Sequence, residues 1–275
     1  MKQVISISRR TDIPAFYLNW LIEHIRKGCI KVANPFNRSQ VRHVSLSREN
    51  VAWLVFWSRN YEFFLQKKEI FSDYNLYFHF TINPSHALLE PGMIRPTVAL
   101  RQMEMLCNHY DPRCIMWRYD PIVFYERNGE LQTNHDIHIF KLFAREVSNM
   151  GIQNCTISIV QIYPKIVKRA KKISNFRFIY PAQNLLKNIL QELTDTASDF
   201  GLTIYSCSND SLLQIANLKK GHCINGALLN HLADEKVSER LLSTRPDCGC
   251  TESIDIGDYV RTRCHFKCLY CYARP

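Results

Sequence analysis

The sequence VAWLVFW, at residues 51–57, is an unbroken run of apolar side chains, most of them β-branched or aromatic. A run of this length without polar alternation is typical of a strand whose two faces are both buried, as in parallel sheets. The polar residues Ser58, Arg59 and Asn60 follow it, and a helical pattern then continues through residues 61–69. The stretch therefore predicts one strand–helix unit of an α/β fold.

The same unit recurs along most of the chain. Further strands are expected at residues 4–8, 76–82, 114–120, 155–163 and 202–207, with a weaker one at 29–34, and helices at 14–27, 96–109, 136–150 and 183–200. Strands that alternate with helices form parallel sheets, so we expect a (βα) TIM-type barrel, full or partial, over residues 1–210. An open doubly wound sheet is the alternative. Residues 211–275 are expected to form a cysteine-rich C-terminal cap packed on the same domain.

Arginine residues follow three of the expected strands. In either architecture ligands bind at the carboxyl ends of the strands, and Arg10, Arg59 and Arg118 lie there. A positive side chain at the start of a helix opposes the helix dipole, so capping does not explain these residues. We expect them to converge on an anionic ligand. Asp120, at the same edge, is our candidate for binding a ribose or an amine, although a turn or capping role would also explain it.

The composition favours a folded protein with an anionic partner. Of the 275 residues 46% are hydrophobic, which is enough for a sizeable core, and the formal net charge is +10. This charge favours either a phosphate-bearing or other anionic small molecule or a nucleic acid, unless it is spread over solvated helix faces. No stretch approaches 18 consecutive apolar residues, and the first residues lack the apolar centre of a signal peptide. We therefore expect a cytoplasmic protein without membrane contact.

The chain contains 11 cysteines. In a reducing compartment this number indicates metal or redox chemistry rather than disulfides. Four of them stand alone and are expected to be small core residues: Cys29, Cys107, Cys114 and Cys155. The other seven lie in the final quarter of the chain and form two sets. These are the triad, Cys264, Cys268 and Cys271, and the quartet, Cys207, Cys223, Cys248 and Cys250.

The triad has the spacing Cys-x3-Cys-x2-Cys within RCHFKCLYCYA, and the aromatic residue Tyr270 directly precedes the last cysteine. This pattern resembles the cluster loop of the radical S-adenosylmethionine (SAM) superfamily. The resemblance implies a [4Fe–4S] cluster whose three thiolate ligands leave one iron free to bind the amino and carboxylate groups of SAM. It also implies a one-electron donor such as a flavodoxin or ferredoxin, and hydrogen abstraction from a substrate by a 5′-deoxyadenosyl radical. The residues expected around the cofactor are Tyr270, Asp120, Arg118, Arg59 and Arg10.

Motifs along nearly the whole chain resemble the DUF1848 family of uncharacterised bacterial proteins. They are ISISRRTDIPAFY, NPFN, VFWSRN, WRYDPI, CGCTESIDIG and the cysteine tail, here residues 261–275. The family has a C-terminal cysteine cluster like that of radical SAM proteins. The chain departs from the radical SAM pattern because its loop comes last rather than after the first strand, and because it has no Gly-Gly-Glu sequence for the SAM amino group. The two ends of a barrel meet, so a late loop can reach the same edge. We expect the bound metal to order this tail.

The quartet can complete a second metal site, since four thiolates saturate either one zinc ion or one cluster. A second [4Fe–4S] cluster, a zinc ion and unligated thiols all stay open for it. Zinc also stays open at the triad, with His265 or an upstream cysteine as the fourth ligand.

The function expected from these features is reductive cleavage of SAM and hydrogen abstraction from an unknown substrate by a radical SAM-type iron–sulfur enzyme. One alternative is a radical SAM lyase or modifying enzyme that acts on nucleic acid, which the net charge favours. The other is a zinc-stabilised binding protein without enzymatic activity. The sequence contains no Gly-rich phosphate loop, HExxH motif or nucleophile elbow.

Overall fold

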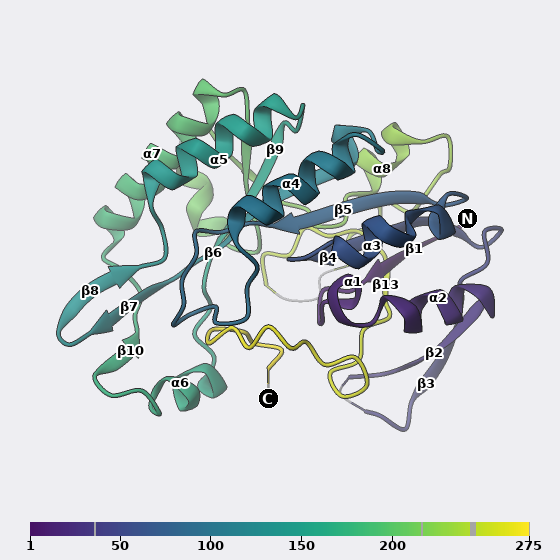
Figure 1. The fold of residues 1–275 in the computed structure, drawn as a ribbon, viewed down its shortest axis with the longest axis horizontal. Helices are drawn as coiled ribbons and strands as arrows, with labels where there is room; N and C mark the ends of the chain where they lie inside the picture. The colour runs from purple at the N-terminus through teal and green to yellow at the C-terminus, as the bar shows by residue number, and fades with distance from the viewer. Residues whose placement is uncertain (36, 216, 243–245, 275) are drawn as a thin grey trace.

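The structure is a computed structural model, and it describes residues 1–35, 37–215, 217–242 and 246–274. Its main sheet has eight parallel strands in the order β12–β11–β9–β6–β5–β4–β1–β13 (Figure 1). Their bounds are β1 (Gln3–Ile7), β4 (Val51–Ser58), β5 (Asn75–Thr81), β6 (Ile115–Ile122), β9 (Asn154–Ile159), β11 (Thr203–Ser206), β12 (Leu218–Lys220) and β13 (Ile254–Asp255). The predicted α/β class with a parallel sheet is confirmed.

The strands of the described residues do not close into a barrel. The strands follow one another in chain order from β1 to β12, but β13 pairs with β1 on the side away from β4. In the described parts of the chain β12 and β13 form the two edges of the sheet and do not pair with each other. Both come from residues 211–275, the segment expected to be a cap, so this segment contributes strands to the main sheet itself.

Helices connect most of the strands. They are α1 (Ile13–Phe16), α2 (Leu18–Arg26), α3 (Glu62–Lys67), α4 (Pro96–Cys107), α5 (Ile137–Asn149), α6 (Pro164–Ala170), α7 (Gln183–Asp199) and α8 (Gly226–Leu232), with the 3-10 turns η1 (Lys68–Phe71), η2 (Pro112–Cys114) and η3 (Asp210–Gln214). None of the helices in the described ranges is long and apolar enough to cross a membrane.

Two small antiparallel sheets accompany the main one. The weak strand expected at residues 29–34 exists as β2 (Cys29–Ala33), but it pairs with β3 (Val41–Ser45) in a separate hairpin. The second small sheet has the order β10–β7–β8, and its strands are β10 (Phe176–Phe178), β7 (Phe124–Arg127) and β8 (Glu130–Thr133). Sequence patterns did not predict this sheet, because strands of three or four residues are too short to show a period.

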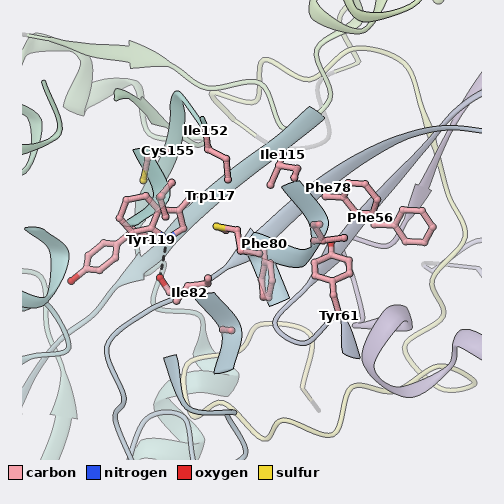
Figure 2. Close-up of a cluster of buried hydrophobic side chains, with 14 of the residues drawn as sticks. Phe56, Tyr61, Phe78, Phe80, Ile82, Ile115, Trp117, Tyr119, Ile152 and Cys155 are labelled. Carbon is pink, nitrogen blue, oxygen red and sulfur yellow. Dashed lines mark hydrogen bonds between the residues drawn. The ribbon is translucent and has the colours of Figure 1, made fainter. Parts of the chain in front are cut away.

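The helix-covered face of the sheet contains the main hydrophobic core. Alternate strand residues such as Phe56, Phe78 and Trp117 point into it and are fully buried. Figure 2 shows these rings, with Cys155, one of the isolated cysteines, beside Trp117; Cys155 is also buried as predicted. The indole N–H of Trp117 donates to the main-chain oxygen of Ile82 at 3.1 Å, so this large side chain is buried with its polar atom paired.

The opposite face of the sheet is covered by the C-terminal part of the chain. The intervening strand residues, among them Trp53, Val55, Tyr77 and Met116, point to this side. They form a second buried cluster with α8 and with the four cysteines of the quartet. The C-terminal segment therefore packs on this face of the sheet.

Strand β13 is fastened to the end of β1 by the buried side chain of Asp255. Its carboxylate accepts hydrogen bonds from Ser6 Oγ at 2.7 Å, Ser8 Oγ at 2.6 Å and the main-chain N–H of Arg9 at 2.8 Å. The Asp255 side chain is almost fully buried, so water does not reach these donors to replace the carboxylate as their acceptor. One side chain thus joins the last strand to the first.

Replacing Asp255 with Ala is therefore expected to lower the free energy of unfolding by about 3 kcal/mol, since these three donors and the main-chain N–H of Gly257 lose their acceptor in a buried place. Urea denaturation measures this change. The matched control is Asp199→Ala, at an exposed position at the end of α7. Equal midpoints for the two variants would contradict this account of Asp255.

Candidate functional site

The triad lies at the carboxyl end of the sheet. Beyond β1 the chain continues into Arg10 and Thr11, and these two residues line one pocket together with Cys264, Cys268 and Cys271. The remaining lining residues are Tyr259, Arg263, Lys267, Ala273 and Arg274. The three thiols thus line one pocket at the carboxyl ends of the strands, which is the position expected from the sequence.

The pocket is electropositive around partly buried thiols. Burial raises the pKa of the Cys264 and Cys268 thiols to about 12, so without a metal these groups are neutral at pH 7. Four cationic side chains line the same pocket: Arg10, Arg263, Lys267 and Arg274. Their charge favours an anionic occupant, such as the group that three thiolates form with a metal.

Protein contacts hold the tail against the sheet. The Tyr270 hydroxyl donates to Glu90 Oε1 and accepts a hydrogen bond from Arg59 Nη2 at 2.8 Å. Arg59 Nη1 also binds Glu90 Oε1, at 2.8 Å, in a salt bridge whose two side chains are 15% and 2% exposed. Because Tyr270 immediately precedes Cys271 and lies two residues after Cys268, this buried network fixes the loop between them.

Further contacts extend along the tail, which runs between α1 and α6 (Figure 1). Arg169 of α6 donates to the main-chain oxygens of Cys271 and Arg274, and Phe16 of α1 packs edge-on against Phe266 with ring centroids 4.7 Å apart. A Cβ on Gly92 would lie 2.7 Å from the Phe266 oxygen, so glycine permits this approach. Protein contacts thus hold the tail, and the expected ordering by a bound metal stays a prediction.

The quartet forms a separate group of thiols on the other side of the end of β1. The sulfurs of Cys207 and Cys223 are 3.3 Å apart, the Cys223 thiol is also hydrogen-bonded to that of Cys250, and the Cys250 thiol to that of Cys248. All four side chains are buried. Three separate segments of the chain bring them together, because Cys207 follows β11 and Cys223 lies beyond β12.

Two of the predicted cofactor residues face the quartet instead of the triad. Arg118 Nη1 donates to Cys223 Sγ at 3.3 Å, and its Nε donates to Asp120 Oδ2 at 3.1 Å. The other carboxylate oxygen of Asp120 accepts a hydrogen bond from Ser158. The positive charge of Arg118 and these hydrogen bonds lower the pKa of Asp120 although its burial would raise it. Both carboxylate oxygens of Asp120 thus accept hydrogen bonds from the protein, so this side chain has a structural role in addition to any role in ligand binding.

Neither cysteine set is preformed around an ion. In residues 1–35, 37–215, 217–242 and 246–274, no three His, Cys, Asp or Glu side chains have the geometry of a metal site.

The isolated cysteines differ in burial. Cys29, expected in the core, is exposed, whereas Cys107 and Cys114 are half-buried.

A larger pocket adjoins the triad. It has a volume of about 330 Å³ and lies between α2, β2 and residues 256–261. Trp20, Ile30 and Val32 give it an apolar wall, and Lys27, Lys31 and Arg261 are cationic residues on it. Gly257 and Asp258 line this larger pocket. Tyr259 and Arg263, which follow them in the chain, line the triad pocket. The two pockets therefore share one loop.

Sequence reasoning missed two residues on which this arrangement depends. Glu90 lies in the loop between β5 and α4, where no period or motif marks a residue, and its partners come from distant segments. Asp255 carried a weak signal, because Ile254, Asp255 and Ile256 alternate as in a short strand.

Loss of the tyrosine hydroxyl should loosen the tail. In a Tyr270→Phe variant the Arg59 and Glu90 groups lose a buried partner, which we expect to cost about 1–2 kcal/mol and to speed amide exchange in residues 264–274 by roughly tenfold. Hydrogen exchange followed by mass spectrometry reads this out. Tyr180→Phe, at an exposed tyrosine, is the control. An unchanged exchange rate in the tail would show that the network does not anchor it.

Comparison with known proteins gives a family but no function. No curated protein matches the chain. A family model described as a domain of unknown function, DUF1848, matches residues 4–273, which is nearly the whole sequence. The chain therefore belongs to the DUF1848 family.

Proposed function

We propose that this protein is a radical SAM-type iron–sulfur enzyme whose cluster is held by Cys264, Cys268 and Cys271. The observation that carries the proposal is the shared pocket of these three thiols at the carboxyl end of a parallel sheet. Ligands of α/β proteins bind at this edge. Three thiolates satisfy three irons of a [4Fe–4S] cluster and leave the fourth iron open.

The residues around the triad fit such a group. When bound, the cluster would supply one electron for reductive cleavage of SAM. Arg10, Arg263, Lys267 and Arg274 would balance the negative charge of the thiolate-bound cluster. The salt bridge between Arg59 and Glu90, with Tyr270, keeps the loop in place behind Cys268. These contacts fix the loop that carries the proposed ligands, and the sulfurs themselves would converge when the metal binds.

We extend the cofactor site from the triad toward Asp120 and Arg118. Arg59 Nη2 donates to the main-chain oxygen of Asp120 at 3.2 Å as well as to Tyr270, so one guanidinium contacts both regions. This continuity supports a role for Arg10, Arg59 and Tyr270 around the SAM molecule, while Asp120 and Arg118 would act on it through Arg59 rather than by direct contact.

We assign an anionic small-molecule substrate to the 330 Å³ pocket, which is lined by residues of the same loop as the triad pocket. The volume suits a small ligand, and an apolar wall with three cationic residues suits an anion with an apolar part.

The test is anaerobic purification and reconstitution with iron and sulfide, followed by incubation with SAM and dithionite. The intact chain should be brown, contain about four irons and four sulfides for the triad, and release 5′-deoxyadenosine. Cys268→Ala should lose the triad iron and all release, whereas Cys107→Ala, at an isolated half-buried thiol, should retain both.

Colourless protein that contains only zinc would overturn the proposal and favour the binding protein stabilised by zinc. Iron-loaded protein that releases no 5′-deoxyadenosine would reject SAM cleavage while keeping the cluster.

One observation favours action on nucleic acid as a second candidate function. Helix α6 and the residues after it carry the exposed side chains of Lys165, Lys168, Lys171 and Lys172, and Arg169 of this helix binds the tail. A cationic strip thus lies directly beside the triad, where it could hold a phosphate backbone.

Reversing the charge of this strip distinguishes the two candidates. If the substrate is a nucleic acid, Lys168→Glu with Lys171→Glu should weaken binding of a fluorescent single-stranded oligonucleotide by about tenfold and flatten its salt dependence. Lys187→Glu, at an exposed lysine of α7, is the control. Equal affinities in the three proteins, or no binding at all, would leave the small anionic substrate as the favoured class.

A further inference from the structure

The proposed function leaves the quartet without a role. Cys207, Cys223, Cys248 and Cys250 are 7%, 9%, 9% and 4% exposed, and they lie in a cluster that otherwise consists of apolar side chains. A buried thiol can pack as a small apolar group, so burial alone requires no further role. Their mutual contact is the feature that needs explanation, because apolar packing does not select one residue type from three chain segments.

The backbone is shaped to bring these segments together. A Cβ on Gly221 would lie 2.5 Å from the Ser206 oxygen, and one on Gly249 would lie 2.6 Å from His222 Nδ1. Glycine at 221 therefore allows an approach of two backbone segments that a Cβ would block, and a Cβ at 249 would displace the His222 ring. The His222 ring binds the main-chain oxygen of Gly249, and the buried ring of His79 binds that of Cys223 at 2.6 Å. The loops that carry the cysteines are thus fixed by contacts on both sides.

Two arginines face the sulfurs. Arg118 directs Nη1 at Cys223 Sγ, and Arg9 lies close enough to interact electrostatically with Cys223, Cys248 and Cys250. A neutral thiol is a weak acceptor, so a buried guanidinium gains little from it. A metal-bound thiolate is an anion, and the same contact then becomes a charge-assisted hydrogen bond. The surroundings of the quartet therefore suit thiolates better than thiols.

We propose that the quartet holds a second metal centre, bound by all four thiolates and separate from the triad. The sulfur spacing supports a compact centre, because a tetrahedral zinc ion with Zn–S bonds of about 2.3 Å keeps its sulfurs about 4 Å apart. Cys207 and Cys223, at 3.3 Å, need only small side-chain rotations to reach it. On binding, a divalent ion replaces four S–H protons, which are released, and gives a centre of net charge −2 beside Arg9 and Arg118. An iron–sulfur cluster shares the same four-thiolate chemistry and requires wider spacing.

The centre would fasten the C-terminal segment to the sheet. Cys207 and Cys223 follow β11 and the edge strand β12, whereas Cys248 and Cys250 precede β13 at the other edge. Four metal–sulfur bonds would therefore join the two edges that do not pair through hydrogen bonds in the described residues.

Metal analysis of the full-length chain tests the proposal. Zinc, iron and sulfide are measured per chain after anaerobic purification for the intact protein, Cys250→Ser and Cys268→Ser. The matched control is Cys114→Ser, because Cys114 packs against the same cluster without belonging to the quartet. Cys250→Ser should lose one zinc ion, or the iron and sulfide of one cluster, while the triad iron remains. Cys268→Ser should show the opposite loss. A Cys250→Ser protein with the same metal content as the intact chain and the control overturns the proposal.

A second measurement keeps the test open if Cys250→Ser does not fold. The variant with Cys264, Cys268 and Cys271 all changed to Ser keeps the quartet intact and is titrated with Co²⁺. Four-thiolate ligation should give intense thiolate-to-cobalt absorption that saturates at one Co²⁺ per chain and is displaced by Zn²⁺. Absence of this absorption overturns the second centre. Because no SAM or reductant is present, this result is independent of whether the triad cleaves SAM.

Discussion

The carboxylate of Asp255 holds the arrangement together, because it ties the last strand of the sheet to the first. It accepts hydrogen bonds from Ser6, Ser8 and the N–H of Arg9, which occupy the end of β1. In a parallel sheet the carboxyl ends of all strands lie on the same side, and ligands bind there. This attachment therefore brings the C-terminal residues to the ligand-binding ends of the strands. A cysteine loop at the end of the sequence can thereby reach the place that a loop after the first strand would occupy.

The end of β1 also separates the two cysteine sets. Arg9 is directed toward the quartet, whereas Arg10 lines the triad pocket, donates to the Gly257 oxygen at 3.1 Å and lies over the Tyr259 ring. Two neighbouring residues thus supply positive charge to two thiol groups. This division gives a physical reason to treat them as separate centres: the triad lies at an electropositive pocket, while the quartet is enclosed among apolar side chains.

Local patterns in the sequence predict much of this fold, but long-range contacts decide the site. The run at residues 51–57 and its counterparts identify six strands of the main sheet, because continuous apolar sequence requires burial on both faces. Strand β13 has only two residues, which is too short to show a pattern. The sequence of β2 does not reveal that it pairs with β3 in a separate hairpin. Cysteine spacing singled out the triad. The partners of Arg118 and Tyr270 could not be predicted, since Cys223 and Glu90 are brought to them by the fold alone.

The most direct test of the central claim is electron paramagnetic resonance of the reduced, iron-loaded protein before and after SAM is added. A variant with all four quartet cysteines changed to Ser restricts the signal to the triad. If the amino and carboxylate groups of SAM bind the iron that lacks a protein ligand, the g values of the reduced cluster should change on addition, and Cys268→Ser should show no cluster signal at all. A reduced cluster whose spectrum is identical with and without SAM would contradict the account.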